Sequence, residues 1–68
     1  MLARNELRGA IAKNGYSQSR LAVALGMSPK TFYTKMEKGV FNSDEIYAMI
    51  KLLHIDDPMS IFFAEEVA

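Results

Sequence analysis

The stretch that decides the fold is residues 17–39, SQSRLAVALGMSPKTFYTKMEKG. It contains two helix-start signals, Ser17 and Ser28, because a serine hydroxyl accepts the free backbone N–H groups at the start of a helix. The second signal is followed by a proline, which the first helical turn tolerates. Apolar residues at helical spacing follow each serine, and a glycine, Gly26 or Gly39, closes each segment. The pattern predicts two short helices joined by a tight turn.

The second of these helices should present a polar side to solvent. Phe32 and Met36 are four residues apart and are expected to face inward, since that spacing places them on one side of a helix. The outward side then carries Pro29, Lys30, Tyr33, Thr34 and Lys38. Two short helices, a tight turn and a polar second helix are typical of the motif that reads the major groove of DNA. We therefore predict a helix-turn-helix over about residues 17–38.

Helical spacing continues on both sides of this motif. It predicts a first helix over residues 3–13, a fourth that begins at Asn42 or Ser43, and a short fifth after Asp57-Pro58. The inward side of the fourth helix should carry Ile46, Met49, Ile50 and Leu53. No segment shows the alternating pattern of a strand. The fold class is therefore predicted to be all-α, with five short helices, and the loop residues Val40 and Phe41 are expected to plug the core.

The length of 68 residues favours a single domain over residues 1–68, since a second core has no room. The chain has no cysteine, which excludes disulfides, thiol catalysis and cysteine-bound zinc, and the single histidine, His54, cannot build a metal site alone. No apolar run approaches the ~20 residues of a membrane span, and we see no signal peptide. We expect a cytoplasmic protein with no cofactor, no metal, no membrane partner and no small-molecule ligand.

Net charge is zero, yet the charges are unevenly distributed along the chain. Residues 1–38 hold seven basic residues against two acidic ones, whereas residues 39–68 hold one basic residue against six acidic ones. Because clustered Lys and Arg drive binding to phosphates, the basic half is a candidate nucleic-acid surface. Acidic residues near helix starts suit caps, and no nucleophile, phosphate loop or metal spacing accompanies them. The sequence therefore does not support an enzyme.

The motif resembles the helix-turn-helix of the lambda-repressor-like family, the Cro/CI or XRE type. The resemblance covers about residues 5–55 and rests on Ser17-Gln18, Leu21-Ala22, Leu25-Gly26-Met27-Ser28, Thr31-Phe32 and Gly39. Short prophage-encoded Cro/CI-type regulators are closer still, and they share Lys35, Phe41, Glu45-Ile46 and Ile61-Phe62-Phe63. One departure is an extra residue between Gly26 and Gly39, which bears on the helix end near Lys38.

The resemblance implies a transcriptional regulator, namely a phage or prophage repressor that reads a double-stranded DNA operator with its third helix. The positions that match base-reading residues of the family are Lys30, Thr34, Pro29 and Tyr33. Lys30 is the candidate for guanine O6 or N7, while Thr34 is a candidate to hydrogen-bond a base or touch a thymine methyl. The candidates for phosphate contact are Gln18, Ser17, Ser28, Arg20, Lys35 and Lys38.

The C-terminal segment, about residues 54–66, is a candidate for dimerisation. It carries four large apolar residues, more than a short terminal helix hides: Met59, Ile61, Phe62 and Phe63. A homodimer, at least on DNA, would pair two half-sites by symmetry. The rival hypothesis is a protein-interaction module on the same scaffold that binds a partner regulator, since fold alone does not decide function.

Overall fold

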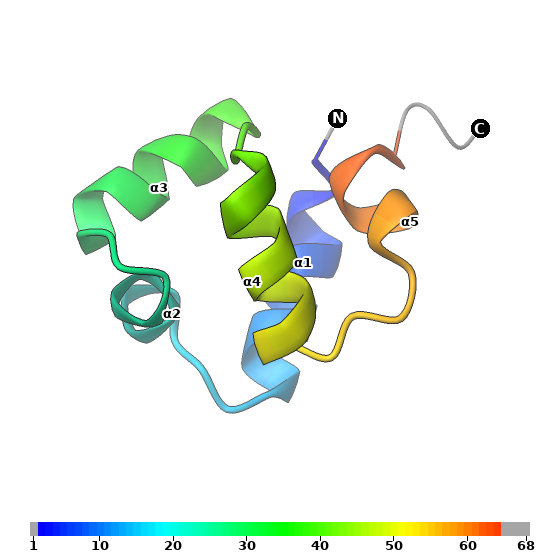
Figure 1. Cartoon of the computed structure of the whole chain (residues 1–68), viewed down its shortest axis with the longest axis horizontal. Helices are drawn as coiled ribbons and strands as arrows, with labels where there is room; N and C mark the ends of the chain where they lie inside the picture. The colour runs from blue at the N-terminus through cyan, green and yellow to red at the C-terminus, as the bar shows by residue number, and fades with distance from the viewer. Residues whose placement is uncertain (1, 65–68) are drawn as a thin grey trace.

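The computed structural model describes residues 2–64, which form five helices and no strand (Figure 1). In chain order the helices are α1 (Arg4–Lys13), α2 (Gln18–Ala24), α3 (Pro29–Lys38), α4 (Ser43–Leu52) and α5 (Pro58–Phe62). The predicted all-α fold class with five short helices is confirmed. The ends of the predicted domain, 1–68, and residues 65–66 of the predicted dimerisation segment lie outside the described residues.

The helix starts follow the capping chemistry of the sequence. The Ser17 hydroxyl accepts the Arg20 backbone N–H at 3.1 Å, and the Ser28 hydroxyl accepts that of Thr31 at 3.2 Å. At α4 the cap is Asn42 and not Ser43, because Asn42 and Glu45 form a reciprocal capping box. Each of these helices therefore begins where a polar side chain satisfies its free backbone N–H groups.

The end of α3 is well defined. The helix runs to Lys38, and Gly39 follows in the left-handed conformation with φ 75°. The Gly39 N–H donates to the Lys35 carbonyl at 2.8 Å, and the Val40 N–H donates to the same carbonyl at 3.1 Å. The extra residue before Gly39 is thus absorbed as ordinary helix, closed by a glycine cap.

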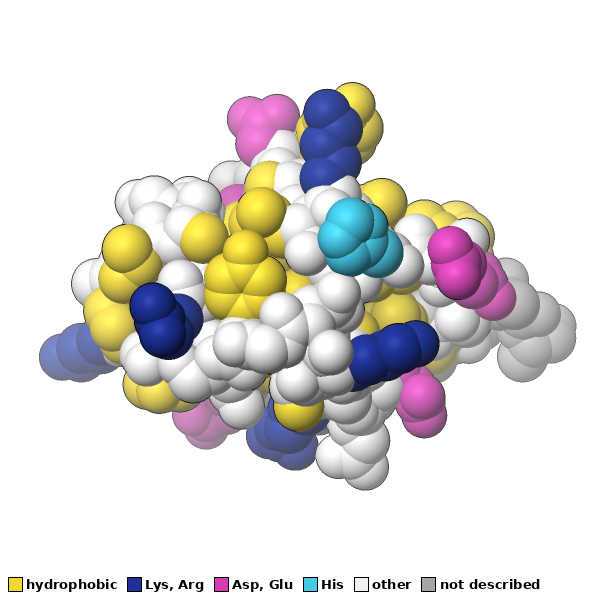
Figure 2. All heavy atoms as spheres, turned by 90° about the horizontal axis from the view of Figure 1, so that it is seen from below, with side chains coloured by type: hydrophobic (Ala, Val, Ile, Leu, Met, Phe, Trp, Pro, Cys, Tyr) yellow, Lys and Arg dark blue, Asp and Glu magenta, His cyan; other side chains and the backbone are white. Residues whose placement is uncertain are grey.

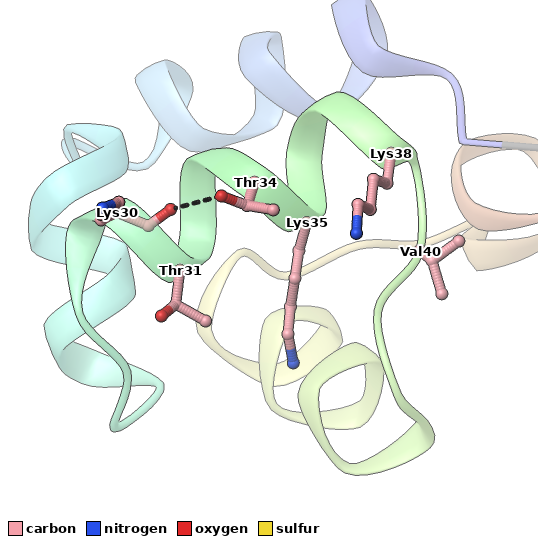
Figure 3. Close-up of a pocket in the computed structure, with 6 residues that line it drawn as sticks. All are labelled: Lys30, Thr31, Thr34, Lys35, Lys38 and Val40. Atoms are coloured by element: carbon pink, nitrogen blue, oxygen red, sulfur yellow. Dashed lines mark hydrogen bonds between the residues drawn. The ribbon is translucent and has the colours of Figure 1, made fainter.

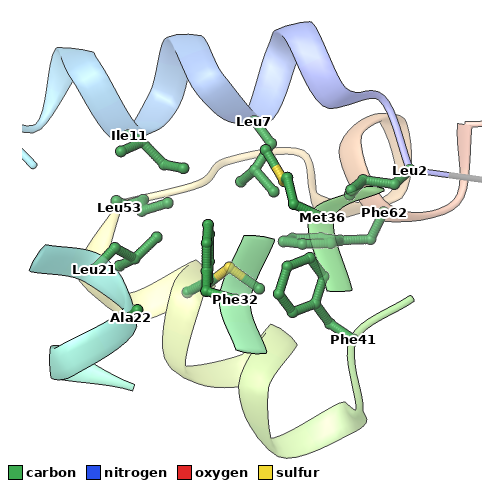
Figure 4. Close-up of a cluster of buried hydrophobic side chains, with 11 residues drawn as sticks. Leu2, Leu7, Ile11, Leu21, Ala22, Phe32, Met36, Phe41, Leu53 and Phe62 are labelled. Carbon is green, nitrogen blue, oxygen red and sulfur yellow. The ribbon is translucent and has the colours of Figure 1, made fainter. Parts of the chain in front are cut away.

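One hydrophobic core lies between the helices (Figure 4). Its largest fully buried side chains are Phe32, Leu7, Leu21 and Met49, one from each of the first four helices. The Phe41 ring packs against Phe32, with 5.5 Å between ring centroids, so Phe41 does plug the core. Val40 does not, since its side chain is 66% exposed, and the prediction for Val40 was wrong. The left-handed turn at Gly39 directs Val40 outward and leaves the inward position to Phe41.

Hydrogen bonds between distant segments hold the helices together. The Asn14 side-chain amide donates to the carbonyls of Ala10 at 2.8 Å and Leu53 at 2.9 Å, joining the ends of α1 and α4. The Ala3 N–H donates to the Ile61 carbonyl at 2.7 Å, which fixes the chain before α1 to α5. None of the helices formed by residues 2–64 is long and apolar enough to span a membrane.

Candidate nucleic-acid interface

Helices α2 and α3 form a helical hairpin with the geometry of a helix-turn-helix. Gly26 turns the chain with φ 79°, and the Met27 N–H donates back to the Ala22 carbonyl at 3.0 Å. Ala22 itself is fully buried, and its small side chain allows α3 to approach α2 closely. These two helices pack more extensively on each other than on the other helices. The turn therefore fixes α3 across α2 with one side free.

The free side of α3 carries three of the residues predicted from the sequence to contact DNA, Lys30, Thr34 and Lys38. Phe32 and Met36 are buried, and Thr34, which is two residues from each, points the opposite way. Lys30 and Lys38, four residues before and after Thr34, extend this exposed row. The row borders a depression of about 440 Å³ (Figure 3), lined by Lys30, Thr31, Thr34, Lys35, Lys38 and Val40.

The remaining predicted base-reading residues lie elsewhere. Tyr33 is exposed on the side of α3 that faces α1 and α2, and it shares a depression of about 340 Å³ with Gln18. Pro29, half-buried, lines a third depression together with Arg20 of α2. The four predicted base readers are thus divided among three depressions. Only Lys30 and Thr34 share one.

The depression at Tyr33 and Gln18 contains a basic residue that the sequence analysis did not single out. Arg8 of α1 lines it, is exposed, and has its guanidinium 3.3 Å from the Asn5 side-chain oxygen. The signal that points to Arg8 is its spacing of four residues from Arg4, which also lines this depression. An arginine, a glutamine and a tyrosine hydroxyl at one place form a set of donors suited to phosphate.

Arg4 has a different task, which the sequence analysis also missed. Its Nε donates to the Met36 carbonyl at 2.9 Å, and a terminal nitrogen donates to the Glu37 carbonyl. The last carbonyls of a helix have no partner within it, and a cation at that end also suits the helix dipole. Arg4 therefore fastens the end of α3 to the start of α1.

Lys35 points away from the exposed row and toward α4 (Figure 3). Its Nζ lies 2.5 Å from a carboxylate oxygen of Glu45, and the side chains are 30% and 13% exposed. Burial raises the pKa of the Glu45 carboxyl, but the Lys35 hydrogen bond, the Asn42 N–H and the Lys35 charge outweigh it, so the pKa lies below its ordinary value. Since its charge is already neutralised within the protein, we do not carry Lys35 into the candidate interface.

The two serines predicted to touch phosphate are exposed but serve as caps. The Ser17 oxygen accepts a backbone N–H, and the Ser28 oxygen accepts one while its hydroxyl donates to Thr31 Oγ1 at 2.9 Å. Lys38 and Arg20, by contrast, are exposed and have basic side chains available at the surface. The candidate interface is therefore built around Lys30, Thr34 and Lys38. Arg8, Gln18 and Tyr33 lie in one neighbouring depression, and Arg20 lies in another.

The residues of the predicted dimer surface are also divided. Phe62 is 6% exposed and belongs to the core, so its ring presents no surface to a second copy. Ile61 and Phe63 are half-buried against the same core, and Met59 is 47% exposed. Packing of α5 against the bundle thus buries Phe62 and partly buries Ile61 and Phe63, and it leaves Met59 exposed.

Charges of both signs are mixed on at least one face of the molecule, although they are separated along the sequence. Figure 2 views the molecule from below Figure 1, on the face where His54, the only histidine, lies. Basic and acidic side chains share that face with hydrophobic ones. The ion pair between Lys35 and Glu45 likewise joins the basic and acidic halves. Within residues 2–64 the His, Asp and Glu side chains form no group of three that could hold a metal ion.

A protein-family model matches the part of the chain that contains the helix-turn-helix. The family model described as bacterial regulatory protein, Fis family, matches residues 4–39, just over half of the chain. The match runs from the first residue of α1 to the glycine cap of α3 and so includes the whole helix-turn-helix. No curated protein and no solved structure matches the chain.

Proposed function

The chain belongs to the Fis family of bacterial regulatory proteins, and we propose that it reads operator DNA in the major groove with the exposed row of α3. Membership of this family makes it a helix-turn-helix protein and a DNA-binding regulator. Because the family is regulatory, we assign the chain no catalytic role. Residues 1–68 are proposed to form one DNA-binding domain.

The observation that carries the proposal is the row of Lys30, Thr34 and Lys38 on the side of α3 opposite its buried residues. A helix fits the major groove, and lysine is a donor suited to guanine O6 and N7. Lys30, near the start of α3, is the proposed guanine reader, and Lys38 at its end is a proposed phosphate contact. Arg8, Gln18 and Tyr33 are proposed to hold an adjacent phosphate, which sets the register of the helix without reading sequence.

The finer role comes from the sequence resemblance to short prophage-encoded Cro/CI-type regulators. On that basis we propose a phage or prophage repressor that binds its operator as a homodimer. Exposed Met59 is the residue of the C-terminal segment best placed for a second copy. Analytical ultracentrifugation at micromolar concentration, with and without operator, tests this proposal. A species of 7.6 kDa alone in the absence of DNA, and one copy per operator in its presence, would reject the homodimer.

Selection of bound duplexes from a random pool tests DNA reading directly. We expect an enriched motif, and Lys30→Ala should weaken binding to it by ~1 to 3 kcal/mol and relax the preference at one base pair. The matched control is Lys13→Ala, which removes the same charge at an exposed position in another depression, beside Glu6, Asp56 and Asp57. The control should bind the motif nearly as the wild type does. Equal losses for the two variants would show that Lys30 contributes only general attraction.

A second candidate function is the protein-interaction module, which the exposed apolar side chains favour. They are Val23, Tyr33, Val40, Tyr47 and Met59. Salt dependence separates the two functions, because phosphate contacts release counterions and make DNA affinity fall steeply as salt rises. Undetectable binding to duplex DNA at about 50 mM salt, where those contacts are strong, would reject the DNA-binding proposal.

A further inference from the structure

Thr34 occupies the middle of the exposed row of α3, between Lys30 and Lys38. A threonine offers a base two kinds of contact, a hydroxyl that donates or accepts hydrogen bonds and a methyl group that packs. Which of the two is free depends on what the hydroxyl already does within the protein. The structure answers that question for this residue.

The Thr34 hydroxyl donates to the Lys30 carbonyl one turn earlier, with an oxygen–oxygen distance of 3.0 Å. A hydroxyl has a single hydrogen, so Thr34 cannot at the same time donate to guanine O6 or N7 or to thymine O4. In Figure 3 the hydroxyl oxygen points toward Lys30 and the methyl carbon points away from it. The Thr34 hydroxyl oxygen can still accept a hydrogen bond but has no hydrogen left to donate, and the methyl group is free for apolar contact.

The surroundings of Thr34 suit an apolar contact. The depression that it borders, about 440 Å³ in volume, is also lined by Thr31, Val40 and three lysines. Lysine stems are aliphatic and pack along apolar groups while their charged ends stay in water. A base contacted here would meet methyl and methylene groups at the centre and positive charge at the rim.

We propose that Thr34 is a specificity-determining residue whose methyl group packs against the C5-methyl of a thymine in the operator. Thymine is the base that displays a methyl in the major groove, and contact with it is a recognised mode of direct readout. This inference rests on the proposed function, since it concerns the same face of α3. It assigns one chemical feature, a methyl, to the centre of that face.

The test uses the full chain and the duplex enriched from the random pool. Each thymine of the enriched motif is replaced in turn by uracil, which removes only the methyl group. At one position the wild type should bind the uracil duplex about fourfold more weakly, the effect expected for one buried methyl. Uracil in the flanking DNA, outside the motif, is the matched control and should change nothing.

Two variants then assign that effect to Thr34. Thr34→Val keeps a methyl and removes the hydroxyl, so it should retain the preference for thymine over uracil. Thr34→Ser keeps the hydroxyl and removes the methyl, so the preference should fall to about one. The converse pattern, with the preference lost in Thr34→Val and kept in Thr34→Ser, would overturn the inference.

Failure of this inference and failure of the proposed function give different results. A wild type that binds no duplex would reject the proposed function and the role of Thr34 with it. Tight, sequence-specific binding with equal affinity for thymine and uracil at every position would leave the proposed function intact and reject the thymine contact. A motif without thymine would have the same meaning.

Discussion

Lys35 of α3 and Glu45 of α4 form an ion pair with 2.5 Å between Nζ and a carboxylate oxygen. The other carboxylate oxygen of Glu45 accepts the backbone N–H of Asn42 at 2.9 Å and closes the capping box of α4. One carboxylate thus starts α4 and holds α3 against it. Because the proposed base-reading row lies on α3, this contact helps to set the orientation of the row relative to the rest of the domain.

Replacing Glu45 with Gln should separate these two tasks. Glutamine also completes a capping box, so the start of α4 is expected to persist while the charge that holds Lys35 is lost. We expect the free energy of unfolding to fall by ~1 kcal/mol, the upper end for partly exposed ion pairs. Urea denaturation measures the change. Asp44→Asn, which removes an exposed charge from the same helical turn, is the control and should cost less. An equal loss in both variants would indicate a helix-dipole effect instead of the ion pair.

The lowered pKa of Glu45 predicts a dependence of stability on pH. The folded protein releases the Glu45 proton more readily than the unfolded chain, whose ordinary pKa is 4.5. The stabilisation is therefore complete above that value and is lost as pH falls through it and then through the lower pKa of the folded state. The wild type and Glu45→Gln should differ in unfolding free energy at pH 7 and converge as the pH falls below the lowered pKa of Glu45 in the folded protein. A constant difference in unfolding free energy as the pH falls from 7 into the acid range would contradict a lowered pKa of Glu45.

Features that depend on neighbouring residues were predicted from the sequence. The caps at Ser17 and Ser28 and the glycine stop after α3 each involve a side chain or backbone group within a few residues. The inward positions of Phe32 and Met36 follow from helical period alone. Local chemistry thus sufficed for the number of helices and for the exposed row of α3.

Features that join distant residues were not predicted. Arg4 binds carbonyls more than 30 residues away, and Lys35 meets Glu45 across a loop, so neither contact has a local signal. Phe62 and Met59 are both large apolar residues of α5, but the direction in which α5 packs buries Phe62 and exposes Met59. The packing of the helices decides which charged and apolar side chains remain at the surface, and the spacing of residues in the sequence does not predict this packing.

Gly9 and Gly39 are predicted to respond in opposite directions to replacement by alanine. Gly9 lies inside α1 with nothing within 4 Å of the added carbon, so Gly9→Ala should stabilise the protein by ~1 kcal/mol through helix propensity. Gly39 has φ 75°, and the added carbon would lie at an ordinary 3.5 Å from Leu2 Cβ, so its cost comes from the backbone. Gly39→Ala should destabilise by ~1 kcal/mol. Thermal unfolding measures both, and a shift of the same sign would contradict the helix end at Gly39.

Arg4 and Arg8, one turn apart on α1, should separate stability from DNA binding. Arg4→Met removes two hydrogen bonds from a guanidinium to the last carbonyls of α3, and we expect unfolding to become easier by ~1 to 2 kcal/mol. Arg8→Met removes an exposed side chain whose hydrogen bond is a long one to Asn5, so stability should change by less than ~0.5 kcal/mol.

The same two variants are then compared on DNA. If Arg8 contacts a phosphate, Arg8→Met should weaken binding to all duplexes alike and reduce the salt slope by about one. Arg4→Met, measured well below its unfolding temperature, should keep the wild-type salt slope, because its guanidinium is engaged by α3. A reduced slope for Arg4→Met with an unchanged slope for Arg8→Met would reverse the two roles. Both side chains line the depression at Gln18 and Tyr33, so the two variants differ in the hydrogen bonds that they remove and not in their location.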